Sequence, residues 1–201
     1  MHYLSLIKYP LLPILIPQGI WAKLKTPRLS EATGARQGSV GTGKIIKLLI
    51  LGDSAAAGVG VDQQAQALIG KIIQHLDAEK YQLQWQLQAK NGNTLLNLHN
   101  IVENLPVQYF DVVIISSGVN DILSQHSLKD WQKNCHQLHE LIQYKFNQPK
   151  ILFTQVPPLQ YFSALPKLLA WYLGQHASLF NLHLKQLSSH LPHFHCVQLQ
   201  L

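Results

Sequence analysis

A serine at the end of a short apolar run, in Gly52-Asp53-Ser54, can act either as a nucleophile or as a helix cap. Residues 45–51 before it are apolar except for Lys47, and the three alanines after it favour a helix. A helix N-terminus offers free backbone N–H groups and the positive end of the helix dipole to an oxyanion. Asp and Ser are also common N-cap residues. The tripeptide alone therefore leaves both interpretations open.

Two further polar motifs favour the nucleophile. The segment 91–94, Asn-Gly-Asn-Thr, follows a second predicted strand, and 118–121, Gly-Val-Asn-Asp, follows a third. The carboxyl ends of parallel strands meet at one edge of a sheet. We expect the Ser54 hydroxyl to attack an acyl carbonyl there, while the N–H groups of Ser54 and Gly92 and the side-chain amide of Asn120 hold the oxyanion. Each such donor stabilises the transition state by roughly 3 kcal/mol.

Strands and helices alternate along most of the chain. The continuous apolar strands, such as 45–51 and 111–117, are typical of a sheet covered on both faces. The segment 81–89 alternates strictly and predicts a half-exposed edge strand. Repeated strand–helix–strand units imply a mostly parallel sheet of about five strands with helices on both faces. Further strands are predicted at 150–156 and 194–201, and helices at 65–76, 94–105, 127–141 and 166–187.

Composition limits the class of protein. The chain has 201 residues, of which 47% are hydrophobic and 13% charged, as expected for one globular domain and not for a disordered protein. A formal charge of +6 lies partly near the N-terminus, but no basic stripe interleaved with aromatics follows it, so no nucleic-acid partner is expected. Cys135 and Cys196 lack metal-ligand spacing, and a disulfide framework is not expected. Two reduced thiols and a cytoplasmic location are the resulting predictions.

The first 44 residues are predicted to form an apolar and basic arm followed by a loop. Residues 3–21 are largely apolar, but Pro10, Pro13 and Pro17 interrupt any helical span, and Lys8 interrupts the apolar run. We predict an irregular arm packed on a domain that spans residues 45–201. Weak membrane-surface contact and a poor export signal are the alternatives. The segment 31–44, rich in Gly, Ser and Thr, is predicted to be a surface loop.

Two other chemistries are excluded by spacing. The segment 38–44 is similar to a phosphate-binding loop, but Ile45 stands where Ser or Thr must reach Mg²⁺, and the glycines precede the strand. His136, His139 and Glu140 do not form a metal site, because adjacent residues such as His139 and Glu140 diverge on a helix. No metal and no other cofactor is therefore expected.

The three motifs resemble those of a known family, the SGNH (GDSL-type) hydrolases, which are esterases, lipases and lysophospholipases. Gly52-Asp53-Ser54 is similar to the nucleophile block, Gly92 to the second block and Gly118-Val119-Asn120-Asp121 to the third. The resemblance extends from about Lys47 to the C-terminus.

This resemblance implies a three-layer, flavodoxin-like α/β fold and serine-dependent hydrolysis of a small acyl ester. Ser54 would be the nucleophile, and Ser54, Gly92 and Asn120 the oxyanion donors. Asp53 would be structural, and Asp121 would orient the loop around Asn120.

One part of the family pattern is missing. Members carry Asp-x-x-His near the C-terminus, where the histidine is the general base and the aspartate orients it. No such motif exists in this chain, and its last acidic residue is Glu140. We expect either that the chain is truncated, without the last loop, the base and the last helix, or that another histidine substitutes. The candidates for a substitute base are His190, His193 and His195.

Truncation has two expected consequences. Esterase activity would be weak or absent, which leaves a catalytically inactive acyl- or lipid-binding remnant as the alternative to an enzyme. A last strand without its covering helix would also expose Val197 and Leu199 to water, and self-association is then expected.

Overall fold

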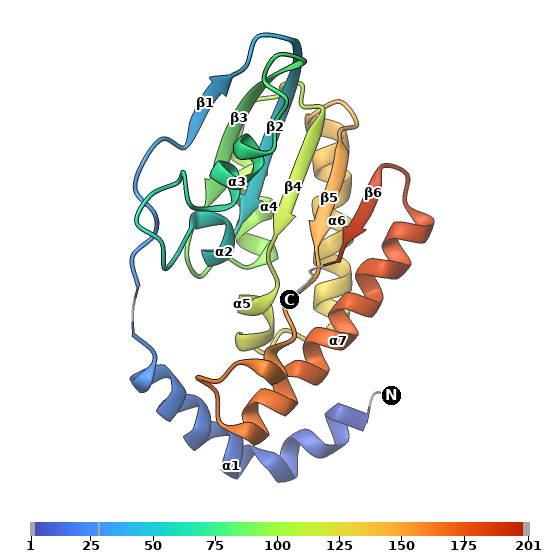
Figure 1. Ribbon diagram of the computed structural model, residues 1–201. Coiled ribbons are helices and arrows are strands. Elements are labelled where there is room, and N and C mark those ends of the chain that lie inside the picture. The colour runs from blue at the N-terminus through green and yellow to red at the C-terminus, as the bar shows by residue number, and fades with distance from the viewer. Residues whose placement is uncertain (1–2, 28, 199–201) are drawn as a thin grey trace.

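The computed structural model describes residues 3–27 and 29–198, which form one six-stranded sheet with helices on both faces (Figure 1). The strands are β1 (Gln37–Val40), β2 (Lys44–Gly52), β3 (Tyr81–Ala89), β4 (Val112–Ser116), β5 (Lys150–Thr154) and β6 (Phe194–Val197). The helices are α1 (Tyr3–Lys25), α2 (Ser54–Ala57), α3 (Leu68–Gln74), α4 (Leu95–Asn104), α5 (Val119–Leu123), α6 (Leu128–Lys145), the 3-10 helix η1 (Leu159–Tyr161) and α7 (Lys167–His190).

Five of the strands are parallel, and they follow the order β3-β2-β4-β5-β6 across the sheet. Gly52 pairs with both Ala89 and Ser116, so β3, β2 and β4 end at the same level. We call this edge, at the carboxyl ends of the parallel strands, the rim. The predicted α/β fold is confirmed, and all three sequence motifs follow strands that end at the rim.

The sixth strand, β1, lies in the segment predicted to be a surface loop. It pairs antiparallel with β3, from Gln37 opposite Gln86 to Val40 opposite Leu83. The prediction that β3 is an edge strand is therefore wrong. The alternation of apolar and polar residues along β3 shows which face of the strand is buried. It does not show whether another strand pairs with β3, because that pairing is made by backbone groups that every residue carries.

The N-terminal segment is helical in spite of its three prolines. Pro10, Pro13 and Pro17 are spaced three and four residues apart, so they share one exposed face of α1. The backbone groups that they leave unpaired can be solvated there, and the helix bends along its length (Figure 1). The prediction of an irregular arm is thus wrong: the prolines remove hydrogen bonds and bend the helix, but they do not end it.

Helix α1 packs on the domain through α7. Leu15 and Ala22 are buried, and the Gln18 side chain accepts a hydrogen bond from the Leu169 backbone N–H at 3.1 Å. Within residues 3–27 and 29–198, no helix combines the length and the hydropathy that a membrane crossing requires.

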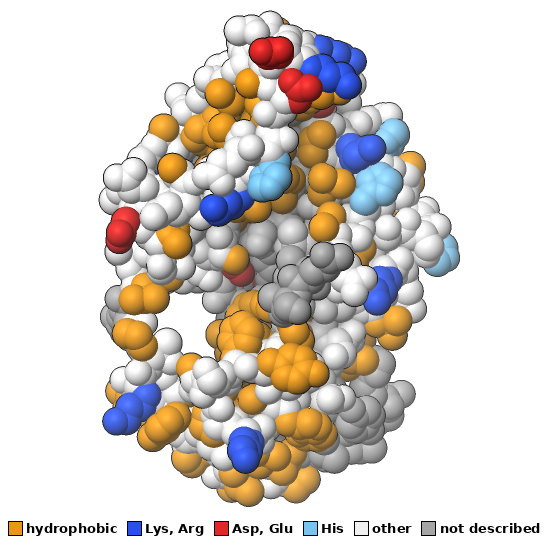
Figure 2. All heavy atoms as spheres, in the orientation of Figure 1, with side chains coloured by type: hydrophobic (Ala, Val, Ile, Leu, Met, Phe, Trp, Pro, Cys, Tyr) orange, Lys and Arg blue, Asp and Glu red, His pale blue; other side chains and the backbone are white. Residues whose placement is uncertain are grey.

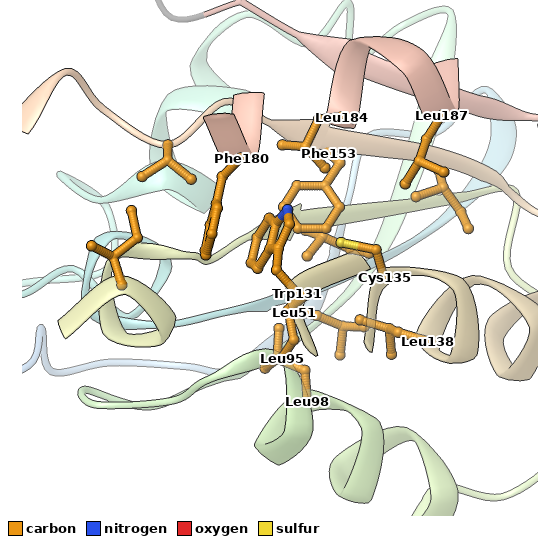
Figure 3. Packing of buried hydrophobic residues seen from close by; sticks show 14 of the residues in the cluster. Leu51, Leu95, Leu98, Trp131, Cys135, Leu138, Phe153, Phe180, Leu184 and Leu187 are labelled. Atoms are coloured by element: carbon orange, nitrogen blue, oxygen red, sulfur yellow. The ribbon is translucent and has the colours of Figure 1, made fainter. Parts of the chain in front are cut away.

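The larger part of the core lies between the sheet and helices α4, α6 and α7 (Figure 3). Trp131 of α6 stacks on Phe180 of α7 with ring centroids 4.2 Å apart, and it meets Phe153 of β5 edge to face at 5.9 Å. Helices α2 and α3 cover the other face over β2 and β3. On that face, Leu152 of β5 is only half-buried and His195 of β6 is exposed.

Candidate active site

Ser54 is the first residue of α2, directly beyond the end of β2. The turn is tight: a Cβ on Gly52 would lie 2.5 Å from the Ala56 Cβ and 2.7 Å from the Ser116 carbonyl oxygen. Only glycine fits there without displacing β4 or α2. The side chain of Ser54 is half-buried, so the local sequence delivers an accessible hydroxyl to the rim.

Asp53 caps helix α2. Its Oδ1 accepts a hydrogen bond from the Ala55 backbone N–H at 3.1 Å, and the residue is only 3% exposed. Burial raises the pKa of the Asp53 carboxyl to about 6, although the hydrogen bond from Ala55 lowers it. Because Asp53 is the cap, the Ser54 hydroxyl is not needed for that role.

The loop after β3 is tied to the nucleophile turn. The side-chain amide of the buried residue Asn93 donates to the Gly52 carbonyl at 3.0 Å, and the Lys90 N–H donates to the same oxygen at 3.2 Å. Gly92 has a φ of +90°, and a Cβ there would meet no atom within 4 Å. The positive φ therefore favours glycine at position 92. The position is exposed, and a side chain there would have free space around it. Sequence analysis did not single out Asn93, whose role depends on a contact distant in sequence.

Asn120 links the third motif to the other two. Its Nδ2 donates to the Asn93 carbonyl at 3.0 Å and lies 3.5 Å from Asp53 Oδ2. One N–H of the amide is therefore firmly held, while the other has only a long contact. The turn before Asn120 needs glycine, since a Cβ on Gly118 would lie 2.5 Å from Val156 Cγ2 and 3.0 Å from the Trp131 ring. The packed core thereby fixes the position of Asn120.

Asp121 is completely buried and points to the start of α4. Its two oxygens accept from the Leu95 backbone N–H at 3.2 Å, and Oδ1 lies 3.2 Å from His126 Nδ1. Burial raises the pKa of the Asp121 carboxyl, and the contacts with Leu95 and His126 lower it in part. Asp121 thus joins α5, which carries Asn120, to the helix that follows the Gly92 loop.

An ion pair outside the predicted site, between Arg36 and Glu31, holds the loop after β3. Arg36 donates to the Ala89 carbonyl and to Glu31 Oε2, the latter at 2.6 Å. Glu31 Oε1 in turn accepts from the Asn91 backbone N–H at 2.6 Å. The pair lies in the segment predicted to be a loop, and no local sequence signal marks it.

The three proposed substitute bases lie away from Ser54. His190 ends α7, and the carbonyl of His193 accepts from the N–H of Ile151, at the start of β5. His195 lies two residues before the rim in β6, which is three strand spacings, or about 14 Å, from β2. His193 precedes β6, which begins at Phe194, so it does not share a strand face with His195. The structure thus does not bring these three candidates to Ser54.

A mostly parallel six-stranded sheet with helices on both faces is the fold class of SGNH-type hydrolases. A family model described as the GDSL-like lipase/acylhydrolase family matches residues 50–200. The chain therefore belongs to this family, and it is an enzyme of the hydrolase kind.

Solved structures show the same fold at low sequence identity. The psychrotrophic esterase EstA from Pseudoalteromonas sp. has a TM-score of 0.56 at 21% identity, over 76% of each chain. An extracellular lipase from Streptomyces rimosus has a TM-score of 0.59 at 12% identity, over 76% of this chain and 80% of the lipase. TesA has a TM-score of 0.54 at 20% identity, over 71% of this chain and 73% of TesA. Among curated proteins, no relative was found.

Proposed function

We propose that this chain hydrolyses a small carboxylic ester with Ser54 as the nucleophile. The oxyanion donors are the backbone N–H groups of Ser54 and Gly92 and the side-chain amide of Asn120. The observation that carries the proposal is the chain of hydrogen bonds from Gly52 through Asn93 to Asn120, which fixes three rim loops relative to one another. Donors held in place before the reaction are the most effective way to stabilise a developing oxyanion.

The chemistry has two half-reactions. Ser54 Oγ attacks the carbonyl carbon, the oxyanion forms towards the donors, and the alcohol leaves as the acyl-enzyme forms. Water then attacks the acyl group and releases the acid. In both steps a proton must leave the attacking oxygen, and without a base a serine hydroxyl is a weak nucleophile. Since His190, His193 and His195 lie away from Ser54, we expect slow turnover in which water, hydroxide or a dissolved base takes the proton.

Imidazole added to the solution tests this proposal. The rate of p-nitrophenyl acetate hydrolysis is measured for the wild type and Ser54→Ala, with the imidazole-only rate subtracted. We expect a low wild-type rate that imidazole raises severalfold, and no enzymatic rate in Ser54→Ala at any imidazole concentration. Equal rates for the two proteins, with and without imidazole, would refute the proposal.

The alternative is a protein that binds an acyl group and does not turn it over. The separation of His190, His193 and His195 from Ser54 is the observation that favours it. Such a protein would bind a fluorescent fatty acid with equal affinity in the wild type and Ser54→Ala, and a serine-directed fluorophosphonate would not label Ser54. Labelling of Ser54 excludes this alternative.

A further inference from the structure

The outward face of helix α1 is apolar, which is unusual for a helix that packs on a domain through one side only. The inward side chains, such as Leu15 and Ala22, are buried against the domain. On a surface helix the opposite face is normally charged or polar. On α1 six large hydrophobic side chains are exposed instead, namely Tyr9, Ile14, Ile16, Ile20, Trp21 and Leu24.

Helix α6 shows what an ordinary surface helix of this protein is like. Its inward side chains, among them Trp131 and Leu138, are buried. Its exposed side chains include Lys129, Asp130 and Glu140. The apolar outer face of α1 is therefore not a general property of the chain's helices.

The apolar surface continues onto the elements next to α1. Tyr161 and Phe162, at and just after η1, and Trp171 in α7 are exposed. Helix α1 reaches α7 through the Gln18–Leu169 hydrogen bond, and η1 packs on α7. Ten of the eighteen exposed large hydrophobic side chains among the described residues lie between 9 and 29 or between 161 and 171. Figure 2 shows hydrophobic side chains gathered over α1.

This surface carries positive charge without any carboxylate. The sequence has no Asp or Glu in residues 1–30 and none in 141–201, the segments that contain α1, η1 and α7. Lys23 and Lys25 lie exposed in the last turn of α1, and Lys167 begins α7. A protein partner with a mixed surface would meet few complementary groups here, whereas an anionic and apolar partner would meet both kinds.

We propose that α1 and the adjoining η1–α7 turn form a docking surface for an anionic lipid bilayer. The exposed aliphatic side chains enter the acyl boundary, Tyr9 and Trp21 lie at the headgroup level, and the lysines pair with lipid phosphates. The prolines of α1 suit this surface, because headgroup water can solvate the backbone groups that they leave unpaired.

Docking would also bring lipid to the end of the molecule that carries Ser54. The turn that contains η1 leaves β5 at the rim and leads into α7, and α1 packs on the first turn of α7. Helix α1 lies beyond this end of the sheet in Figure 1. That lipid esters are the substrate rests on the proposed function, whereas the docking itself does not depend on Ser54.

Vesicle flotation with the full chain tests the docking surface. Vesicles of phosphatidylcholine alone are compared with vesicles that contain phosphatidylglycerol, for the wild type and the variant Ile16→Ser/Ile20→Ser/Trp21→Ser. The matched control is Val107→Ser/Tyr144→Ser/Leu182→Ser, which removes three exposed apolar side chains elsewhere. Circular dichroism verifies that each variant is folded.

We expect the wild type and the control to bind anionic vesicles at least about tenfold better than neutral ones, and salt to weaken the binding. The α1 variant should bind at least about tenfold less, and Lys23→Gln/Lys25→Gln should lose severalfold on anionic vesicles only. Ser54→Ala should bind like the wild type even if ester hydrolysis fails. Equal binding by the α1 variant and the control would overturn the proposal. So would a wild-type dimer that the α1 variant dissociates, without vesicle binding, since a second copy would then cover this face.

Discussion

The rim of the sheet has two unlike halves. At the ends of β3, β2 and β4, side-chain amides and carboxylates join three loops, as in the bonds from Asn93 to Gly52 and from Asn120 to Asn93. At the ends of β5 and β6, the polar contacts are of another kind: Val156 exchanges two hydrogen bonds of 2.8 Å with Asn181 of α7, and no acidic residue follows Glu140.

The difference separates two tasks of a serine hydrolase. The first half positions the serine and the oxyanion donors with hydrogen bonds of its own, and Val156, beyond β5, adds a packing contact at Gly118. Removal of the serine proton is a different task, and His195, the histidine of β6, lies about 14 Å from β2. We therefore expect substitutions in the first half to change reactivity and substitution of His195 to leave it unchanged.

The largest effect is expected from Asn120→Ala. The loss of one oxyanion donor should lower the Ser54-dependent rate by about 100-fold, or roughly 3 kcal/mol. The measurement is p-nitrophenyl acetate hydrolysis with added imidazole, above the Ser54→Ala baseline. His195→Ala is the control from the other half, and its rate should stay within about twofold of the wild type. A comparable loss in His195→Ala would show that the second half takes part.

Substitutions at two glycines of the first half should lower the stability of the protein to different extents. Gly118→Ala forces a Cβ against Val156 and Trp131 at a φ of +131°, and should lower the free energy of unfolding by about 3 kcal/mol. Gly92→Ala meets only the cost of a positive φ, about 1 kcal/mol, because the space around it is open. Urea unfolding measures both. Equal losses would mean that the core does not fix the Asn120 turn.

The buried carboxylate of the first half should make stability depend on pH. The pKa of Asp53 is about 6 in the folded protein and lies near 3.8 when unfolded. The folded state therefore binds the proton more tightly, and its stability should fall as pH rises from about 4 to about 6, by about 3 kcal/mol. Urea unfolding of the wild type and Asp53→Asn over this range isolates the effect. A wild-type profile parallel to that of Asp53→Asn would contradict it.

The smallest effect is expected from the pair that holds the Gly92 loop from outside. Arg36 and Glu31 are partly exposed, so Glu31→Gln should weaken the loop by about 1 kcal/mol. The Ser54-dependent rate should then fall roughly fivefold, with little change in urea midpoint. Glu79→Gln, at an exposed position before β3, is the matched charge control. An unchanged rate in Glu31→Gln would show that this ion pair does not hold the Gly92 loop in position for the reaction.

Local patterns predicted the parts of the molecule whose causes are local. The apolar run of β2, the alternation of β3 and the helix predicted from residue 127 all appear in the structure as expected. The three motifs meet at the rim because repeated strand–helix units make the strands parallel, so that their carboxyl ends lie at one edge of the sheet.

The remaining parts depend on contacts distant in sequence. The pairing of β1 with β3 and the bridge from Glu31 to Asn91 have no local signal. Helix α1 was not predicted, because proline in a helix interior costs about 3 kcal/mol and the packing of α1 on α7 that opposes this cost is a contact distant in sequence. The separation of His195 from Ser54 likewise needed the strand register.

The most direct test of the account is the reaction of Ser54 with a serine-directed fluorophosphonate, followed by mass spectrometry of the digested protein. We predict one adduct, on the peptide that contains Ser54, which forms faster in imidazole and is absent from Ser54→Ala. No adduct after prolonged incubation, or the same adduct mass in Ser54→Ala, would contradict the central claim that the rim holds an accessible nucleophile.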